Sequence, residues 1–148
     1  MRGEYCEIRG PWAGLIQGLV YPLPHHDGLS LGLHFTKTLW GTVLVGPTAA
    51  YVEGKDNYER DRMTIPEFVS DAKTMLPELQ ESDLQLGYTG LRPKLVPPGG
   101  QGIADFVIEP DKEVPRVIQL IGIESPGLTA APAIANHVFK LVEEILHR

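Results

Sequence analysis

The sequence predicts an α+β protein with a mostly antiparallel sheet, one helix that crosses it, and a C-terminal strand–helix unit. Three observations predict this class. Short apolar runs in the first half are separated by Gly and Pro turns, as in an antiparallel meander. A capping box then opens an amphipathic segment in the middle of the chain. The final third joins an apolar run to a Gly/Pro turn and a helical apolar stripe.

The first half contains four β-rich runs, each bounded by turn residues. In the third run Phe35 faces one side of the predicted strand, whereas His34 and Thr36 face the other, less apolar side. Side chains on the less apolar side are the ones available for chemistry. We expect strands at residues 4–8, 15–22, 29–37 and 42–47.

The middle of the chain predicts one amphipathic helix. Thr64 is its cap, Pro66 lies in its first turn, and Glu67 stands three residues after the cap and completes a capping box. Apolar residues then recur at helical spacing for about four turns, and Pro77 ends or kinks the helix. Extended chain is expected again over residues 84–93.

The last third predicts two strands and a long helix. Strands at residues 106–109 and 117–123 are joined by a polar hairpin, and the helix covers about residues 131–146 with one apolar stripe. The run at 117–123 contains mostly apolar residues, so we expect it to be buried. A buried strand that leads into a helix is typical of parallel sheets.

Composition limits the function. The 148 residues carry a net charge of -6, and this charge argues against nucleic acid as the partner. No apolar run is long enough to span a membrane and no signal peptide is apparent, so we expect a cytoplasmic protein, with loose membrane association as an alternative. The single cysteine, Cys6, excludes an internal disulfide, and we favour a structural role for it over a nucleophilic one.

Two groups of residues allow a chemical reading that we do not favour. His25, His26 and Asp27 are adjacent in a loop, where neighbouring side chains point apart, so a solvated loop is favoured over a metal site. Asp105 and Glu109 lie in or beside a predicted strand. We favour a strand end that faces solvent there over a functional pair of carboxylates.

Seven motifs follow one another along nearly the whole chain. They are Arg-Gly-Glu-Tyr at residues 2–5, Val-Tyr-Pro-Leu-Pro at 20–24, Leu-His-Phe-Thr-Lys at 33–37, Val-Gly-Pro-Thr-Ala at 45–49, Tyr-Thr-Gly-Leu-Arg-Pro-Lys at 88–94, Asp-Phe-Val-Ile at 105–108 and Ser-Pro-Gly-Leu-Thr-Ala-Ala at 125–131. This series resembles the C-terminal portion of the D-amino-acid oxidase-like FAD-dependent oxidoreductases. Within them it is most similar to the L-2-hydroxyglutarate dehydrogenase/oxidase branch.

The resemblance implies an FAD enzyme that oxidises the carbon next to a carboxylate by hydride transfer to the flavin. It implies that residues 1–116 form a substrate-domain-like sheet with a helix, and that residues 117–148 supply a strand and helix to a Rossmann-like FAD domain. Arg92 of the Gly-Leu-Arg-Pro motif is then the residue that binds the substrate carboxylate. His34, as catalytic base or carboxylate partner, and Thr36 then line the substrate cavity. The flavin edge is then contacted by Pro126, Gly127, Leu128 and Thr129.

Each of these residues also has a plainer interpretation. A guanidinium binds a carboxylate through two charge-assisted bonds, but Arg92 could equally be a surface arginine paired with an acidic neighbour. The pKa range of imidazole suits proton removal, but His34 could be a histidine buried in the sheet. Thr129 could be the cap of the last helix, which is compatible with flavin contact because other N–H groups stay free.

The chain contains no strand–Gly-rich loop–helix for a dinucleotide, since the glycines at 99–102 lack that context. We therefore expect the chain alone to be inactive and to bind FAD weakly. We expect it to require an N-terminal FAD-binding half or a partner subunit, with homo-oligomer formation as a further outcome. The alternatives to hydroxyacid oxidation are glycine- or D-amino-acid-oxidase-like amine oxidation and a non-catalytic module.

Overall fold

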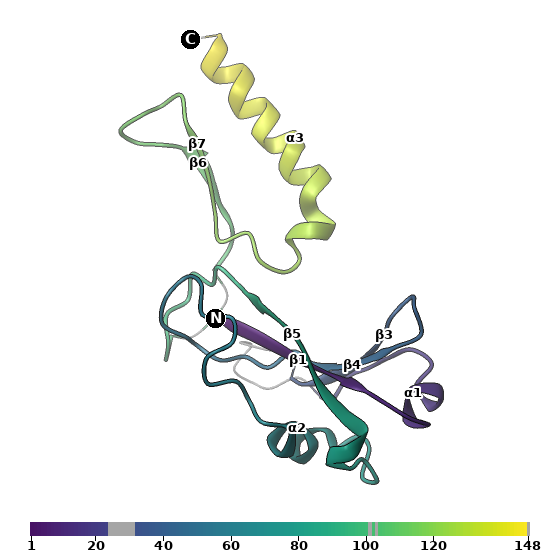
Figure 1. The fold of residues 1–148 in the computed structure, drawn as a ribbon. Coiled ribbons are helices and arrows are strands. Elements are labelled where there is room, and N and C mark those ends of the chain that lie inside the picture. Colours follow the sequence, from purple (N-terminus) through teal and green to yellow (C-terminus); the bar gives the residue numbers. More distant parts are fainter. Residues whose placement is uncertain (24–31, 101, 103, 148) are drawn as a thin grey trace. The chain divides into compact units, whose positions relative to one another are not determined.

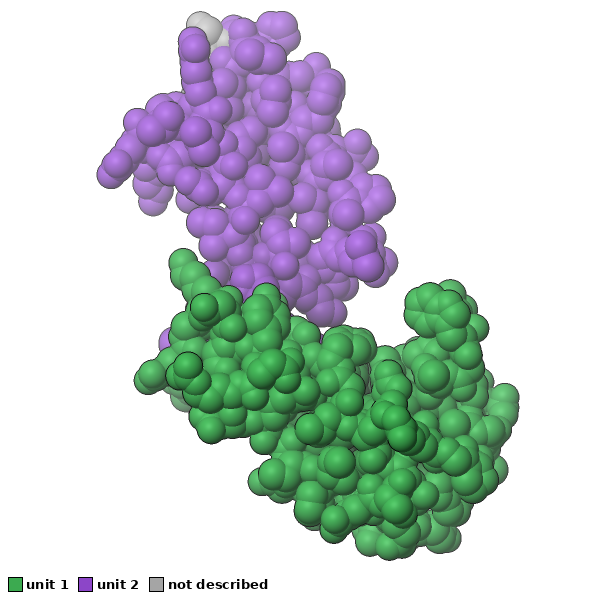
Figure 2. Space-filling model, viewed as in Figure 1, with its two compact units in different colours: residues 1–91, 98–102 green, residues 92–97, 103–148 purple. Residues whose placement is uncertain are grey.

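The computed structural model describes residues 1–23, 32–100, 102 and 104–147 (Figure 1). The chain divides into two compact units, coloured separately in Figure 2. Unit 1 comprises residues 1–91 and 98–102, and unit 2 comprises residues 92–97 and 103–148. The boundary expected at residue 117 concerns the domains of a longer enzyme and stays a prediction.

Unit 1 is built on a five-stranded sheet with the order β2-β3-β4-β1-β5, and its strand pairs are antiparallel. The expected α+β class and antiparallel sheet are confirmed. The elements of unit 1 in the described residues are β1 (Arg2–Ile8), α1 (Trp12–Leu15), β2 (Leu19–Val20), β3 (His34–Lys37), β4 (Val43–Gly46), α2 (Ile65–Ala72), a short 3-10 helix η1 (Glu81–Asp83) and β5 (Leu84–Leu91).

The core of unit 1 lies between one face of this sheet and α2. Cys6 on β1 pairs with Val45 on β4, which in turn pairs with Phe35 on β3, and all three side chains are buried. Phe68 and Ala72 of α2 belong to the same core cluster. Burial of the apolar positions of each strand on one face fixes the register, because a shift by one residue would turn them all to the other face.

The helix α2 starts as predicted but is shorter. Thr64 and Glu67 form the expected capping box, with the Thr64 N–H donating to Glu67 Oε2 over 2.7 Å. The expected length of about four turns is wrong, since α2 ends at Ala72 after eight residues. Pro77 has no N–H and disfavours helical backbone before it, so the chain continues in turns that still bury Leu76 and Leu79.

The strand expected at residues 15–22 is also wrong in part. Residues Trp12–Leu15 form the short helix α1, and only Leu19 and Val20 pair in the sheet. Pro11 at the start of α1 has φ -67°, which is already helical. The Trp12 indole N–H donates to Asp83 Oδ2 over 3.1 Å, and this bond attaches α1 to η1.

Unit 2 contains a hairpin and one long helix. Strands β6 (Val107–Pro110) and β7 (Ile118–Ile121) pair antiparallel with each other, as the predicted polar hairpin requires. The expectation that the second of these strands is buried, as in a parallel sheet, is wrong. Leu120 is 47% exposed and Ile121 is 45% exposed, because β6 is the only strand paired with β7 in the described residues.

The helix α3 (Gly127–Leu146) begins four residues earlier than expected. Its N-cap is Pro126, so Thr129 lies inside the first turn and the expectation that it caps the helix is wrong. Pro132 falls in the sixth helical position, where it removes one backbone hydrogen bond. None of the helices in the described part of the chain is long and apolar enough to cross a membrane.

Candidate functional site

His34 begins β3 and has a defined orientation within unit 1. Its ring stacks on Tyr21, with ring centres 4.1 Å apart, and its side chain is buried. Nδ1 lies 2.9 Å from the carbonyl oxygen of Gly32. Because a carbonyl only accepts hydrogen bonds, Nδ1 carries the proton in the neutral ring, and the lone pair is therefore on Nε2. This tautomer fits a proton acceptor at Nε2.

Thr36 follows two positions along the same strand and therefore faces the same side of the sheet as His34. Phe35 between them points into the core and is 2% exposed. The alternation predicted for this strand is thus confirmed. The side of the sheet that carries His34 also carries Tyr5, since a β-carbon built on Gly46, the partner of His34, would meet the Tyr5 ring.

Arg92 follows β5 and belongs to unit 2, where it lies near an acidic side chain. Its Nη1 is 3.9 Å from Glu124 Oε2, and the Nζ of Lys94 is 3.3 Å from Glu124 Oε1. Glu124 and Lys94 are almost covered, whereas the Arg92 side chain is 38% exposed. The acidic neighbour expected by the plainer interpretation of Arg92 is therefore present, and the closer pair is Lys94–Glu124.

The turn between β7 and α3 places backbone donors at a helix N-terminus. The Gly127 N–H donates to the Glu124 carbonyl over 2.5 Å, and Ala130 donates to Pro126 over 2.9 Å. The N–H groups of Leu128 and Thr129 have no acceptor within the described residues, as expected for a first helical turn. A hollow of about 370 Å³ lies against this turn and is lined by residues 123–129.

Gly127 is required at this turn for steric reasons. A β-carbon there would lie 2.6 Å from Ile123 Cγ2, closer than two carbon atoms pack. The helix dipole and the free N–H groups make the turn suited to an anionic or electron-rich ligand edge. Unit 2 thus brings together Arg92 and the predicted turn Pro126–Thr129, through Glu124. His34 and Thr36 lie in unit 1.

The remaining candidates give no further site. Cys6 is fully buried in the core, in agreement with a structural role. Asp105 and Glu109 are both exposed, as expected of residues at a strand end. No cluster of three metal-ligating side chains occurs among the described residues. His25, His26 and Asp27 lie outside those residues.

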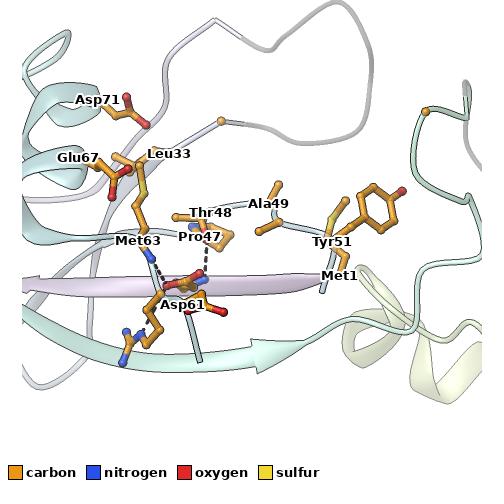
Figure 3. A pocket seen from close by; sticks show the side chains of 15 residues that line it. Met1, Leu33, Pro47, Thr48, Ala49, Tyr51, Asp61, Met63, Glu67 and Asp71 are labelled. Carbon is orange, nitrogen blue, oxygen red and sulfur yellow. Dashed lines mark hydrogen bonds and ion pairs between the residues drawn. The ribbon is translucent and has the colours of Figure 1, made fainter. Parts of the chain in front are cut away.

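A second hollow, of about 770 Å³, lies within unit 1 between the sheet and α2 (Figure 3). Its wall includes the carboxylates of Glu4, Glu67 and Asp71 and the guanidinium of Arg62. Glu4 accepts from Arg2, Arg62 and the Met63 N–H, and Glu67 accepts from Thr64. Every buried side-chain polar atom in the described residues has a partner, so this hollow presents no group that calls for a ligand.

Three residues of the site were missed by sequence reasoning. Tyr21 stacks on His34, and Lys94 and Glu124 pair beside Arg92. A cation two residues after Arg92, and a carboxylate at the edge of the turn before the last helix, were visible signals of a charged cluster. The pairing itself joins positions 30 residues apart, which local patterns do not reveal.

The fold defines a class: an α+β chain with a five-stranded antiparallel sheet in one unit and a hairpin with a long helix in the other. The family model described as "FAD dependent oxidoreductase" matches residues 1–141. The chain therefore belongs to the DAO family of FAD-dependent oxidoreductases, whose cofactor is FAD. The N–H groups of Leu128 and Thr129 fit the electron-rich pyrimidine edge of that flavin.

Named relatives agree with this assignment. The mitochondrial L-2-hydroxyglutarate dehydrogenase of Arabidopsis thaliana is 38% identical over 93% of this chain and 30% of its own length. The L-2-hydroxyglutarate dehydrogenase of Indibacter alkaliphilus is 26% identical, over 93% of this chain and 42% of its own length. The FAD-bound L-alpha-glycerophosphate oxidase of Mycoplasma pneumoniae matches with a TM-score of 0.75 and 28% identity, over 96% of this chain and 35% of that one. The chain thus spans between 30% and 42% of these relatives.

Proposed function

We propose that this chain is the substrate-side, C-terminal segment of an FAD-dependent oxidoreductase that oxidises a 2-hydroxy acid such as L-2-hydroxyglutarate. The observation that carries the proposal is the cluster in unit 2, where Arg92, Lys94 and Glu124 gather at the turn suited to the flavin edge. The 38% identity to an L-2-hydroxyglutarate dehydrogenase supports this substrate class.

The residues of this chain have separate roles in the proposed reaction. Arg92 binds the substrate carboxylate through its planar guanidinium, and Thr36 lines the substrate cavity. His34 takes the hydroxyl proton on Nε2, while the Gly32 carbonyl holds Nδ1–H. Pro126, Gly127, Leu128 and Thr129 contact the flavin edge, and a positive helix terminus stabilises negative charge there. The flavin, when bound, supplies the hydride acceptor.

In our proposal, this chain binds the FAD cofactor only together with a partner. The helix α3 exposes Leu128, Phe139 and Leu146, and a groove of about 460 Å³ on unit 2 is lined almost entirely by apolar side chains. We propose that an N-terminal FAD-binding portion or partner subunit covers this surface. Self-association is the alternative outcome when that portion is absent. Cytoplasmic placement stays a prediction, and the Arabidopsis relative is named as mitochondrial.

A chimera tests the proposal. In it, this chain replaces the matching 30% of the Arabidopsis enzyme. The chimera should bind FAD and oxidise L-2-hydroxyglutarate with a higher kcat/KM than glycine or glycerol 3-phosphate. A preference for glycerol 3-phosphate would support a second candidate, which the similarity to the glycerophosphate oxidase favours. A preference for glycine would support amine oxidation. A chimera that binds FAD and oxidises none of the three would favour a non-catalytic module.

A further inference from the structure

Glu124 of unit 2 carries a carboxylate that faces the side chains of both Arg92 and Lys94. Its Oε1 faces Lys94 Nζ at 3.3 Å and its Oε2 faces Arg92 Nη1 at 3.9 Å. The Glu124 side chain is 14% exposed and that of Lys94 is 12% exposed. Water screens this pair much less than it screens pairs at the protein surface, so the interaction restricts both side chains more strongly than a surface pair does.

The backbone also holds the segment of Arg92 and Lys94 against the segment that contains Glu124. Lys94 N–H donates to the Arg92 carbonyl over 2.8 Å, across Pro93, so the two cations have a fixed spacing along the chain. On the other side, Glu124 N–H donates to Gly122 over 2.8 Å. A β-carbon on Gly122 would lie 2.6 Å from Leu95 Cδ1, which shows that the two segments pack directly on each other.

Resting on the proposed function, we infer that Glu124 is a positioning residue for substrate binding. It holds Arg92 and Lys94 against the turn that opens α3, and so it sets the place of the carboxylate-binding guanidinium relative to the helix N-terminus. Arg92 by itself is partly exposed on a long flexible side chain, and restraint of its rotamers lowers the entropy that is lost when substrate binds. In this role Glu124 acts through Arg92 and Lys94, although it also lines the hollow at the turn.

The first test uses the 148-residue chain. In Glu124→Gln, amide hydrogen exchange at Gly127 and Ala130 should become about tenfold faster, because the charge-assisted contact to Lys94 is lost. Lys94→Met should have the same effect. Glu143→Gln is the matched control, since Glu143 is exposed on α3, and exchange at Gly127 should stay unchanged in it. Unchanged exchange in both Glu124→Gln and Lys94→Met would overturn the inference.

The second test uses the chimera and a double-mutant cycle. Glu124→Gln should lower kcat/KM for L-2-hydroxyglutarate by about tenfold when Arg92 is present, mainly through a higher KM. In the Arg92→Ala background the same change should cost less than about twofold, because no guanidinium remains to be positioned. Equal losses in both backgrounds would show a purely structural role and overturn the inference.

The two proposals fail in different ways. A chimera that oxidises none of the substrates contradicts the proposed function. The exchange result on the 148-residue chain then decides whether Glu124 holds Arg92 and Lys94 against the turn. A chimera that is active, with additive losses for Arg92→Ala and Glu124→Gln, contradicts only the positioning role.

Discussion

Arg2 and Glu4 form an ion pair in the interior of unit 1, with Arg2 Nη2 at 2.9 Å from Glu4 Oε1. Both side chains are 2% exposed. Arg2 also donates to the carbonyl oxygens of Arg60 and Asp61, and Glu4 accepts from the Met63 N–H. These bonds attach the segment before α2 to β1. They explain how a motif that begins Arg-Gly-Glu can be buried without an unpaired charge.

We expect Glu4→Gln to lower the free energy of unfolding by about 3 to 5 kcal/mol, because it leaves the buried Arg2 without its counter-charge. The measurement is urea unfolding followed by circular dichroism. Glu59→Gln is the matched control, since Glu59 pairs with Arg62 while 71% exposed, and should cost less than about 1 kcal/mol. Equal losses in the two variants would contradict the buried network.

The thiol of Cys6 should be unreactive toward thiol reagents in the folded protein. Burial raises the pKa of its thiol to about 11, so at neutral pH almost none of it is thiolate, the reactive form. Labelling with a thiol reagent at about pH 8 should therefore be much slower in buffer than in denaturing urea. Labelling at the same rate in both would show that Cys6 is accessible, and would contradict its place in the core.

The capping box of α2 should make part of the stability depend on pH. Hydrogen bonds from the hydroxyl and the N–H of Thr64 lower the pKa of Glu67 below its ordinary value. A lowered folded-state pKa contributes stability above the unfolded value, about 4.5, which is lost as pH falls through the folded value. The Tm difference between the wild type and Glu67→Gln should therefore shrink from about pH 6 to about pH 3. A constant difference would contradict the capping role.

The apolar face of unit 2 should make the isolated chain self-associate. Phe139 is 61% exposed and lines the apolar groove between β7 and α3. Phe139→Ser should shift the chain toward monomer in analytical ultracentrifugation, because it removes apolar area from the surface that associates. His137→Ser, on the same helix and outside the groove lining, should leave the distribution unchanged. A wild-type chain that stays monomeric at high concentration would contradict this expectation.

The sequence was informative wherever a local period or turn decides structure. Alternation on β3 placed Phe35 on the core face and His34 on the opposite face, and the spacing of Thr64 and Glu67 located the start of α2. Lengths were harder to predict, because α2 ends at Ala72, before Pro77 is reached, while the apolar stripe continues into turns. Apolar content alone misplaced residues 117–123 in a buried strand, since burial depends on what covers β7.

The candidate site was predicted through its motif residues, and its charge partners were not. Arg92 and the turn at 126–129 follow from the Arg-Pro and Ser-Pro-Gly motifs. The role of Glu124 depends on a contact between segments that are far apart in the chain, and that contact exists only once unit 2 is folded. The N-cap of α3 is Pro126 and not Thr129, since helical backbone already begins at Gly127.

The most direct test of the central claim is flavin reduction in the chimera under anaerobic conditions. We expect L-2-hydroxyglutarate to reduce the flavin, and we expect Arg92→Ala to lower kcat/KM by about 30- to 1,000-fold, equivalent to about 2 to 4 kcal/mol. Arg116→Ala, an exposed arginine in the same unit, should leave kcat/KM unchanged. A flavin that binds but is not reduced, or an Arg92→Ala variant with unchanged kcat/KM, would contradict the account.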